Sequence, residues 1–220
     1  MHRFPEPELM DDPAQALAYA QADFSEPHGM FIDKFCDLFP DEKIAGNVLD
    51  LGCGPADITI RFARAFPRCH IDRVDGAASM LAQGELAIKK EKLTNRVQLI
   101  KGILPAARLP HSQYEVIISN SLLHHLHKPA VLWECVKNCA AKDTIVFIMD
   151  LKRPESEEAV KKLVNTYAGA EPLILQRDFH NSLCAAFTPD EVRDQLKHAD
   201  LTHLRLETIS DRHLIVFGRI

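Results

Sequence analysis

The stretch that decides the fold is NVLDLGCGP, residues 47–55. Its apolar first half, which ends at Leu51, is typical of a short buried strand, and Gly52 and Gly54 follow as a tight turn. Residues 58–66 then show the apolar spacing of a helix that packs on a sheet. A strand, a glycine turn and a helix leave free backbone N–H groups at a helix N-terminus, where the anionic or polar end of a nucleotide-like ligand binds. The stretch therefore predicts a site for such a ligand.

Bulk composition limits the classes of protein to consider. The chain has 220 residues, of which 46% are apolar, which suits one large α/β domain, residues 1–220. Its formal net charge of −5 argues against a nucleic-acid partner. No apolar run is long enough for a transmembrane helix, so we expect no membrane partner. Residues 1–12 are acidic and proline-rich and lack the pattern of a secretion signal.

The cysteines indicate a reducing compartment. None forms a Cys-x-x-Cys pair, and their neighbours are mostly apolar. Small buried thiols are therefore expected rather than disulfides or zinc ligands, and we predict a cytoplasmic protein. The six are Cys36, Cys53, Cys69, Cys135, Cys139 and Cys184.

Strand and helix patterns alternate through the middle of the chain. Helices are expected at about 58–66, 79–92 and 130–140, and strands at 48–51, 70–75, 97–101, 114–119 and 144–150. Such βαβ alternation implies a parallel sheet with right-handed crossovers. The last twenty residues instead predict a hairpin around 210–212, so the sheet should end in an antiparallel pair.

The flanks of this core are predicted to be helical. Residues 13–22, capped by Asp12, and residues 26–39 form an N-terminal addition that could cover a site. A helix is expected at 156–168, ended by Gly169, and another after Thr188, which forms a capping box with Glu191. Residues 177–182 are polar and are expected to lie between these helices. We divide the chain into a helical lid (1–45), a ligand-binding core (46–150), and substrate-shaping helices with the hairpin (151–220).

Three polar side chains stand at the carboxyl edge of the expected sheet. Asp50 ends the first strand, and Asp75 ends the second strand, where an acidic side chain can accept both hydroxyls of a ribose. Asn120 lies just past the fourth strand. Because ligands in open α/β sheets bind at this edge, the three residues support the prediction made from the glycine turn.

Three motifs together resemble those of class I S-adenosylmethionine-dependent methyltransferases. The stretch LDLGCGPAD (49–57) resembles their first motif, and VDGAASML (74–81) looks like their second. Leu109 and Pro110, followed by YEVIISNSLLHHL (114–126), are similar to their fourth. The resemblance implies a Rossmann-like, seven-stranded, mostly parallel sheet with helices on both faces and a reversed last strand. It also implies S-adenosyl-L-methionine as the cofactor.

The resemblance implies roles for particular residues toward that cofactor. The glycine turn would pass the methionine part, Asp50 would orient the turn, Asp75 would hold the ribose, and the backbone near Asn120 would meet the methionine end. Two positions depart from the family pattern: Ala56 replaces a frequent third glycine, and Ile103 stands where an aspartate often follows Gly102. The expected cofactor-binding residues are Asp50, Gly52, Gly54, Asp75, Gly76, Met80, Gly102, Ile103, Leu104 and Asn120.

A nicotinamide dinucleotide is the competing ligand. Its fingerprint is Gly-x-Gly-x-x-Gly, but the position three residues after Gly54 is Asp57. A carboxylate there would repel a pyrophosphate at the helix start, whereas the sulfonium of S-adenosylmethionine carries a positive charge. The sequence therefore favours S-adenosylmethionine.

Candidates for chemistry follow the fourth and fifth strands. His124 or His125 could act as a general base, or could merely close a turn by hydrogen bonding. Asp150 could bind an acceptor amine or take its proton, or could cap the next loop, and Arg153 could bind a carboxylate or be solvated. Tyr19, with Asp23, Phe24 and Ser25, could cover the methyl group or simply pack. The predicted catalytic residues are His124, Asp150 and Tyr19.

No metal site is expected from His124, His125 and His127, because their spacing lacks an i,i+4 pair and a nearby carboxylate.

The predicted function is methyl transfer from S-adenosylmethionine to a small molecule. Two alternatives stay open: an enzyme that cyclises or cleaves the cofactor, or only senses it, and a methyltransferase that modifies RNA. The accepting atom, the use of a base and the oligomeric state are not determined by these patterns.

Overall fold

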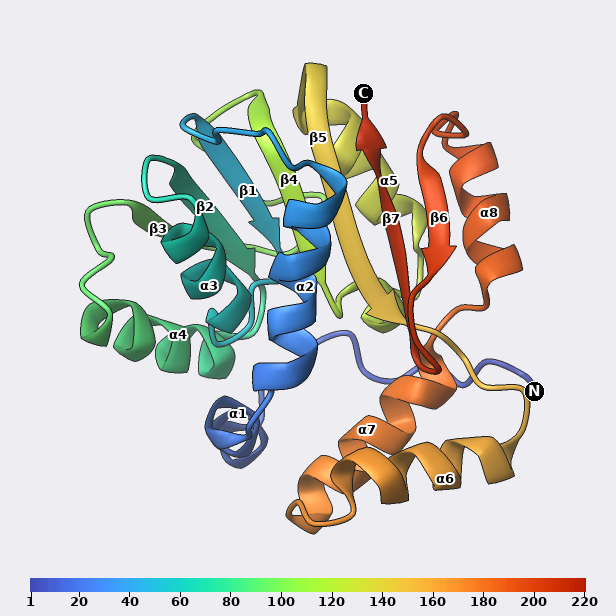
Figure 1. Cartoon of the computed structure of the whole chain (residues 1–220). Coiled ribbons are helices and arrows are strands. Elements are labelled where there is room, and N and C mark those ends of the chain that lie inside the picture. The colour runs from blue at the N-terminus through green and yellow to red at the C-terminus, as the bar shows by residue number, and fades with distance from the viewer.

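The computed structural model describes all residues, 1–220, and contains a seven-stranded sheet in the order β3-β2-β1-β4-β5-β7-β6 (Figure 1). The first five strands are parallel, and β7 runs antiparallel to both of its neighbours. The predicted fold class and terminal hairpin are thus confirmed. The strands are β1 (Asn47–Leu51), β2 (His70–Asp75), β3 (Val97–Lys101), β4 (Tyr114–Asn120), β5 (Ala140–Leu151), β6 (Arg205–Thr208) and β7 (His213–Arg219).

Eight α-helices and one 3-10 turn accompany the sheet. They are α1 (Pro13–Gln21), α2 (Ser25–Leu38), α3 (Asp57–Ala65), α4 (Ala78–Lys90), η1 (Leu123–His125), α5 (Ala130–Cys139), α6 (Glu157–Ala168), α7 (Leu173–Ala185) and α8 (Pro189–His198). No helix has both the length and the apolar character needed to span a membrane.

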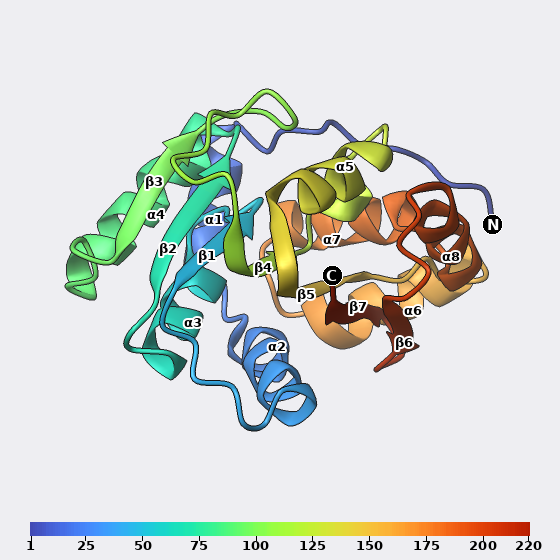
Figure 2. The ribbon, with the colours of Figure 1, turned by 90° about the horizontal axis from the view of Figure 1, so that it is seen from above.

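Helices cover both faces of the sheet, as Figure 2 shows. On one face, α2, α3 and α4 bury an apolar cluster that includes Phe31, Phe35 and Phe62. On the other face, α5 and α8 pack through residues such as Trp133 and Leu196. The strands alternate between the two clusters because successive side chains of a strand point to opposite faces. Two faces of buried side chains make the core a three-layer sandwich.

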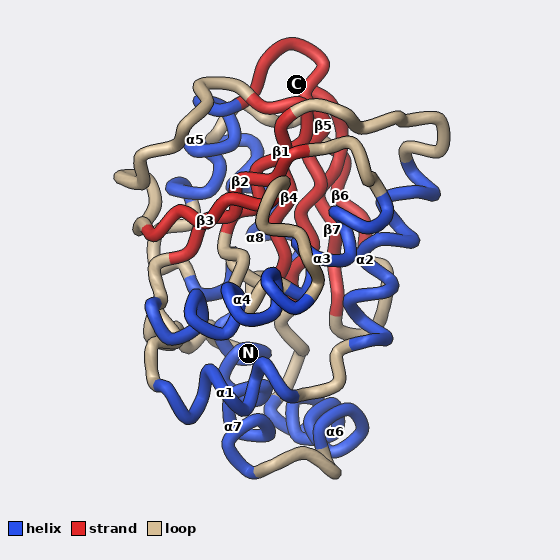
Figure 3. Tube along the Cα trace, turned by 90° about the vertical axis from the view of Figure 1, so that its left-hand side faces the viewer, coloured by secondary structure: helices blue, strands red, loops and turns tan.

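The remaining helices gather at the carboxyl ends of the parallel strands. In Figures 1 and 3, α1, α6 and α7 lie together beneath that edge of the sheet. The helix α1 packs against α4 and α7, and α6 packs against α7. A cap of helices therefore covers the edge where ligands bind in this class of sheet.

Residues 1–12, which we call the N-terminal strap, run across this same edge. Phe4 N–H donates to the carbonyl of Cys184, and Arg3 Nε donates to the carbonyl of Ala185 at 2.6 Å. At the other end of the strap, Asp11 accepts from the backbone N–H of Ser79 at 2.8 Å. The strap thus joins α7 to the start of α4. The sequence showed only its acidic and proline-rich composition.

Two local expectations are wrong. Residues 177–182 belong to α7 rather than to a loop, because the segment after Pro172 contains no residue that breaks a helix. Five of the six cysteines are buried free thiols as expected, but Cys36 is exposed.

Candidate active site

A cavity of about 880 Å³ lies at the carboxyl edge of the sheet. Its wall combines the glycine turn, the ends of β2, β3 and β4, the strap, α1, η1 and α7. Twelve of the thirteen residues expected from the sequence to form the site line it. They are Tyr19, Asp50, Gly52, Gly54, Asp75, Gly76, Met80, Gly102, Ile103, Leu104, Asn120 and His124.

The glycine turn has left-handed backbone at three positions: Gly52 (φ 72°), Gly54 (φ 49°) and Ala56 (φ 71°). A Cβ at Gly52 would lie 2.8 Å from Leu122, so this glycine lets the β4 loop approach closely. A Cβ at Gly54 would meet nothing within 4 Å, because this position faces the cavity. Ala56 is fully buried and keeps the left-handed conformation in spite of its Cβ, at some cost in strain. The replacement of the third glycine is therefore tolerated.

Asp75 is fixed at the end of β2 by two backbone donors. Its Oδ2 accepts from Gly54 N–H and its Oδ1 from Ala77 N–H, both at 2.8 Å. Burial raises the pKa of this carboxyl, while the backbone hydrogen bonds oppose that change. Each oxygen has a second lone pair, so the carboxylate can still accept two hydroxyl groups from the cavity.

Asp50 has a different environment, although it also ends a strand at the cavity. Only 1% of its surface is exposed, and its Oδ2 accepts from Thr59 Oγ1 at 2.5 Å. Burial raises the pKa of Asp50 to about 6, and the Thr59 hydroxyl and Arg73 oppose the shift. The hydrogen bond from Thr59 to Asp50 therefore links the strand end before the glycine turn to α3.

An apolar wall closes the side of the cavity next to β3. Met80 packs with Ala16 and Ala77, and Ile103 is 56% exposed. Leu9 of the strap also reaches this wall, since a Cβ at Gly76 would lie 2.8 Å from it. Leu9 was not expected from the sequence, because the strap shows no periodic pattern.

Asn120 ends β4 on the opposite side of the cavity. Its Nδ2 donates to Ser121 Oγ at 3.2 Å, and its Oδ1 is buried without a hydrogen-bond partner. Ser121 has left-handed backbone, φ 55°, which turns the chain sharply into η1. The unpaired amide oxygen gives this corner an acceptor for a donor group of a ligand.

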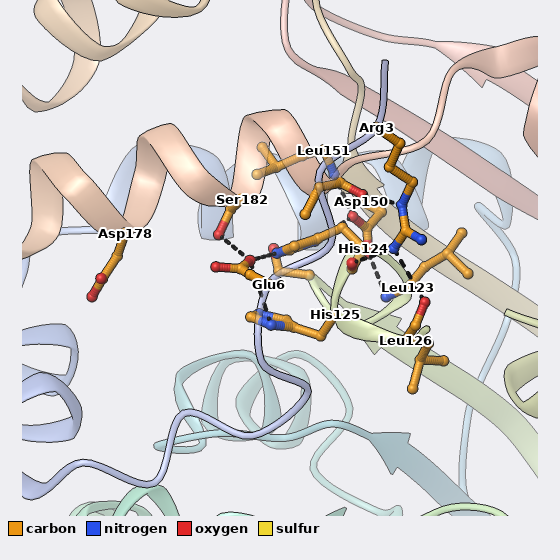
Figure 4. A network of polar contacts seen from close by, with 12 residues as sticks. Arg3, Glu6, Leu123, His124, His125, Leu126, Asp150, Leu151, Asp178 and Ser182 are labelled. Carbon is orange, nitrogen blue, oxygen red and sulfur yellow. Dashed lines mark hydrogen bonds and ion pairs between the residues drawn. The ribbon is translucent and has the colours of Figure 1, made fainter. Parts of the chain in front are cut away.

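His124 and Asp150 form a buried dyad, although Asp150 itself does not line the cavity. His124 Nδ1 lies 2.6 Å from Asp150 Oδ1 (Figure 4). Asp150 also accepts from the backbone N–H groups of Leu123 and Leu151, both at 2.7 Å. Burial opposes protonation of His124, yet the charge of Asp150 raises the pKa of this imidazole. The carboxylate fixes the ring so that Nε2 points away from it.

Glu6 of the strap faces the dyad. Its Oε1 lies 3.7 Å from His124 Nε2 and 3.5 Å from His125 Nδ1, and it accepts from Ser182 Oγ at 2.9 Å. Glu6 was not expected from the sequence, because it lies 118 positions before His124 in a terminus whose only signal is its acidic, proline-rich composition. Burial raises the pKa of Glu6.

Aromatic residues of α1 and α2 cover another part of the cavity. The rings of Tyr19 and Phe24 lie 4.6 Å apart, and those of Phe24 and His28 lie 5.1 Å apart. Burial, with Asp57 nearby, raises the pKa of Tyr19 to about 12, so its phenol stays protonated at neutral pH. Tyr19 is thus suited to donate a hydrogen bond and not to remove a proton.

Asp57, the residue that disfavoured a pyrophosphate, lies at the start of α3 between the side chains of His28 and Arg61. His28 Nδ1 lies 2.6 Å and Arg61 Nε 2.7 Å from Asp57 Oδ2. Burial opposes ionisation, but these hydrogen bonds lower the pKa of Asp57. Asp57 is therefore a carboxylate at the mouth of the glycine turn. His28 was not expected to belong to the cavity wall.

Arg153 lies outside the cavity. It is 8% exposed, donates to the carbonyl of Ala186 at 3.0 Å, and pairs with Glu191 at 2.6 Å. Both readings of this residue, as a substrate anchor and as a solvated side chain, are therefore wrong. It connects the end of β5 to the start of α8.

Comparisons with known proteins agree with this geometry. Residues 48–142 match a family model described as a methyltransferase domain. The chain is 31% identical over 102 residues to a ribosomal RNA small subunit methyltransferase C of Shewanella denitrificans, covering 44% of this chain and 28% of that protein. It is 33% identical over 105 residues to a malonyl-[acyl-carrier protein] O-methyltransferase of Priestia megaterium, covering 47% of this chain and 35% of that protein. The matches thus span about a third of these curated relatives.

Similarity in structure extends over nearly the whole chain. A SAM-dependent methyltransferase from Aquifex aeolicus superposes with a TM-score of 0.67 at 18% identity. The superposition covers 95% of this chain and 98% of the other. At this level of identity the likeness establishes the shared fold.

Proposed function

The chain belongs to the class I S-adenosylmethionine-dependent methyltransferases, and from that premise we propose that it transfers a methyl group to a small molecule. The observation that carries the proposal is the cavity itself. It runs from the glycine turn and Asp75 to the His124–Asp150 dyad, beneath α1, α7 and the strap. One cavity therefore offers both a cofactor site and an acceptor site.

The residues present fit S-adenosylmethionine. Gly54 leaves open space at the turn, Asp75 retains two acceptor lone pairs for ribose hydroxyls, and Asn120 Oδ1 lacks a partner. Met80 and Ile103 supply an apolar surface for the adenine base of the cofactor. A carboxylate at Asp57 is compatible with a cofactor that has a sulfonium and no phosphate. The cavity volume falls within the range of small-molecule sites.

S-adenosylmethionine, when bound, supplies a methyl group activated by a positively charged sulfur. The acceptor's lone pair forms the new bond to the methyl carbon, the carbon–sulfur bond breaks with its electron pair on sulfur, and the acceptor loses a proton where it carries one. The chain must align the acceptor and exclude water for this displacement. We assign alignment to Tyr19 and Asn120, and contact with the acceptor group to His124, whose ring Asp150 orients.

A small acceptor fits the coverage of the cavity better than RNA does. The strap is fixed at both ends, by Phe4 and Arg3 on α7 and by Asp11 on α4. The helices α1 and α7 complete the cover, and the net charge of −5 offers no general attraction for phosphates. A cytoplasmic location, expected from the cysteines, is part of the same proposal.

The first test is calorimetric titration with S-adenosylmethionine and S-adenosylhomocysteine. Asp75→Asn should bind both about 10- to 100-fold more weakly, because the ribose hydroxyls lose a charged acceptor worth about 1.5–3 kcal/mol. Asp72→Asn is the matched control: Asp72 is a buried carboxylate of the same strand that accepts from Tyr114 OH at 2.8 Å, outside the cavity. Equal affinity of Asp75→Asn and the unmodified protein would show that the cofactor placement is wrong.

Two further experiments on the unmodified protein distinguish methyl transfer to a small molecule from the alternative functions. Incubation with S-adenosylmethionine alone should leave the cofactor intact, whereas an enzyme that cleaves or cyclises it would release a fragment without any acceptor. Binding to RNA should be weak, and a strong affinity that falls steeply with salt would instead favour an RNA-modifying enzyme. A mixture of small hydroxyl, thiol and amine compounds, read for methylated products by mass spectrometry, identifies the acceptor class.

A further inference from the structure

Three metal-binding side chains meet where the strap crosses η1. Glu6 comes from the strap, and His124 and His125 come from η1; their ligand atoms all lie within 4.8 Å of one another (Figure 4). From this convergence we propose that Glu6, His124 and His125 bind a divalent transition metal ion of the zinc type. Their spacing in sequence gives no sign of the site, because the carboxylate arrives from the N-terminus.

The distances suit a metal better than a direct hydrogen bond. Glu6 Oε1 lies 3.7 Å from His124 Nε2 and 3.5 Å from His125 Nδ1, beyond the usual range of hydrogen bonds. In a tetrahedral zinc site with bonds of about 2.0–2.1 Å, neighbouring ligand atoms lie about 3.3 Å apart. The three atoms therefore need only a small closing movement to surround an ion.

Two of the three ligands have a neighbour that orients them. Asp150 occupies Nδ1 of His124 at 2.6 Å and so leaves Nε2 as its free nitrogen. Carboxylate–histidine pairs of this kind fix the ring and strengthen the ligand in known metal sites. Ser182 Oγ donates to Glu6 Oε1 at 2.9 Å and holds that carboxylate toward the histidines.

The unsatisfied ligand is His125. Its Nδ1 is buried without a hydrogen-bond partner, and the residue is 8% exposed. A buried polar nitrogen without a partner is uncommon in native proteins and calls for an explanation. Coordination would satisfy this nitrogen, and the ion's two positive charges would balance the carboxylates of Glu6 and Asp150.

Two histidines and one glutamate leave a fourth position open, as in catalytic zinc sites. Both histidines line the cavity, so an acceptor hydroxyl, thiol or amine could occupy that position. The ion would lower the pKa of the bound group, release its proton to solvent and leave the nucleophile that attacks the methyl carbon. This role rests on the proposed function and replaces general-base catalysis by His124; the binding of the ion does not depend on it.

The test uses the full chain without a histidine tag, stripped with a chelator and titrated with Zn²⁺ alone and with Co²⁺ alone. We expect one tight equivalent and a visible Co²⁺ spectrum without thiolate bands. Glu6→Gln and His125→Asn should each weaken binding at least tenfold. Glu8→Gln and His127→Asn are matched controls from the same two segments, outside the ligand set, and should bind as the unmodified protein does.

Asp150→Asn keeps all three ligands but weakens the support of His124, and should bind Zn²⁺ about 10- to 100-fold more weakly. Three results would each overturn the proposal: weak binding of metal at many sites, thiolate bands in the Co²⁺ spectrum, or a metal affinity of Glu6→Gln and His125→Asn equal to that of the unmodified protein. The cluster would then be an ion-pair network only. Calorimetry with S-adenosylhomocysteine runs in parallel on each variant. If the protein binds S-adenosylhomocysteine but no metal ion, only the metal site is refuted. If it binds one metal ion but no S-adenosylhomocysteine, only the proposed function is refuted.

Discussion

At the scale of single residues, buried ionisable groups at the carboxyl edge of the sheet differ according to their neighbours. Asp75 keeps open acceptor capacity because backbone N–H groups hold it in the cavity wall, whereas Asp50 is shielded by Thr59 and its pKa rises to about 6. Both residues end neighbouring strands and look alike in the sequence. Solvent access and hydrogen-bond donors therefore give the two carboxylates different capacities to accept a hydrogen bond from a ligand.

His213 gives a pH prediction at this scale. It is 5% exposed, and burial, with Arg212 nearby, lowers its pKa from 6.5 to about 4. As pH falls from 7 to 5, the unfolded chain protonates this histidine and the folded chain does not, so unfolding becomes easier. This group should remove about 2 kcal/mol of the free energy of unfolding between those two pH values.

Urea unfolding at pH 7 and pH 5 measures the effect. His213→Gln should lose about 2 kcal/mol less than the unmodified protein over that interval. The exposed His70→Gln serves as the control and should keep the full loss. An unchanged pH dependence in His213→Gln would show that this histidine is protonated in the fold.

At the scale of elements, the strap is the segment that completes the site. Arg3 donates through Nη2 to the carbonyls of His124 and Leu126, at 2.8 and 3.1 Å, and its guanidinium lies 3.9 Å above the ring centre of Phe187. Since η1 carries both histidines of the dyad region, Arg3 also fixes the position of η1. A segment without secondary structure thus sets the geometry of the cavity.

Arg3→Met should loosen the strap. Loss of charged donors to three carbonyls should cost about 1–3 kcal/mol and expose residues 1–12 to a broad-specificity protease. Arg193→Met is the control, because Arg193 forms an exposed i,i+3 pair with Asp190, worth little. Cleavage of the strap at the same rate in Arg3→Met and the unmodified protein would mean that these hydrogen bonds do not hold it.

At the scale of the whole molecule, the N-terminal helices have separate tasks. The helix α2 belongs to the core: Phe31 and Phe35 are fully buried, and Phe35 packs against Phe62 and Phe147 with ring centres 5.0 and 5.6 Å apart. The helix α1 instead packs on α4 and α7 over the cavity. We therefore assign the covering role proposed for residues 1–45 to the strap, α1 and the first turn of α2, whereas the rest of α2 belongs to the core.

Phe35→Ala tests this division. It should lower the free energy of unfolding by about 3–5 kcal/mol, because a large buried ring is replaced by a cavity in the core. Leu86→Ala, at a residue of α4 that is 64% exposed, should change it by less than about 0.5 kcal/mol. Urea denaturation measures the free energy of unfolding of both variants. A small loss in Phe35→Ala would mean that α2 does not belong to the core.

The sequence by itself determined the sheet, its crossovers and the residues of the glycine turn. Strand and helix periodicity, the residues of the turn and the capping box at Thr188 are local signals, and the structure confirms each of them. Carboxyl ends of parallel strands meet at one edge, so the sequence alone predicts that Asp50, Asp75 and Asn120 lie together there, as they do.

Only the tertiary structure decided what surrounds that edge. Glu6 approaches His124 and His125 across more than a hundred residues of chain, and Leu9 of the same strap lies against Gly76. Arg153 turned out to pair with Glu191 because α8 packs beside the end of β5. Such contacts depend on where a segment without periodicity packs on the rest of the fold. No local sequence pattern indicates that position. The glycine turn was therefore predictable from sequence, whereas the charges facing the acceptor were not.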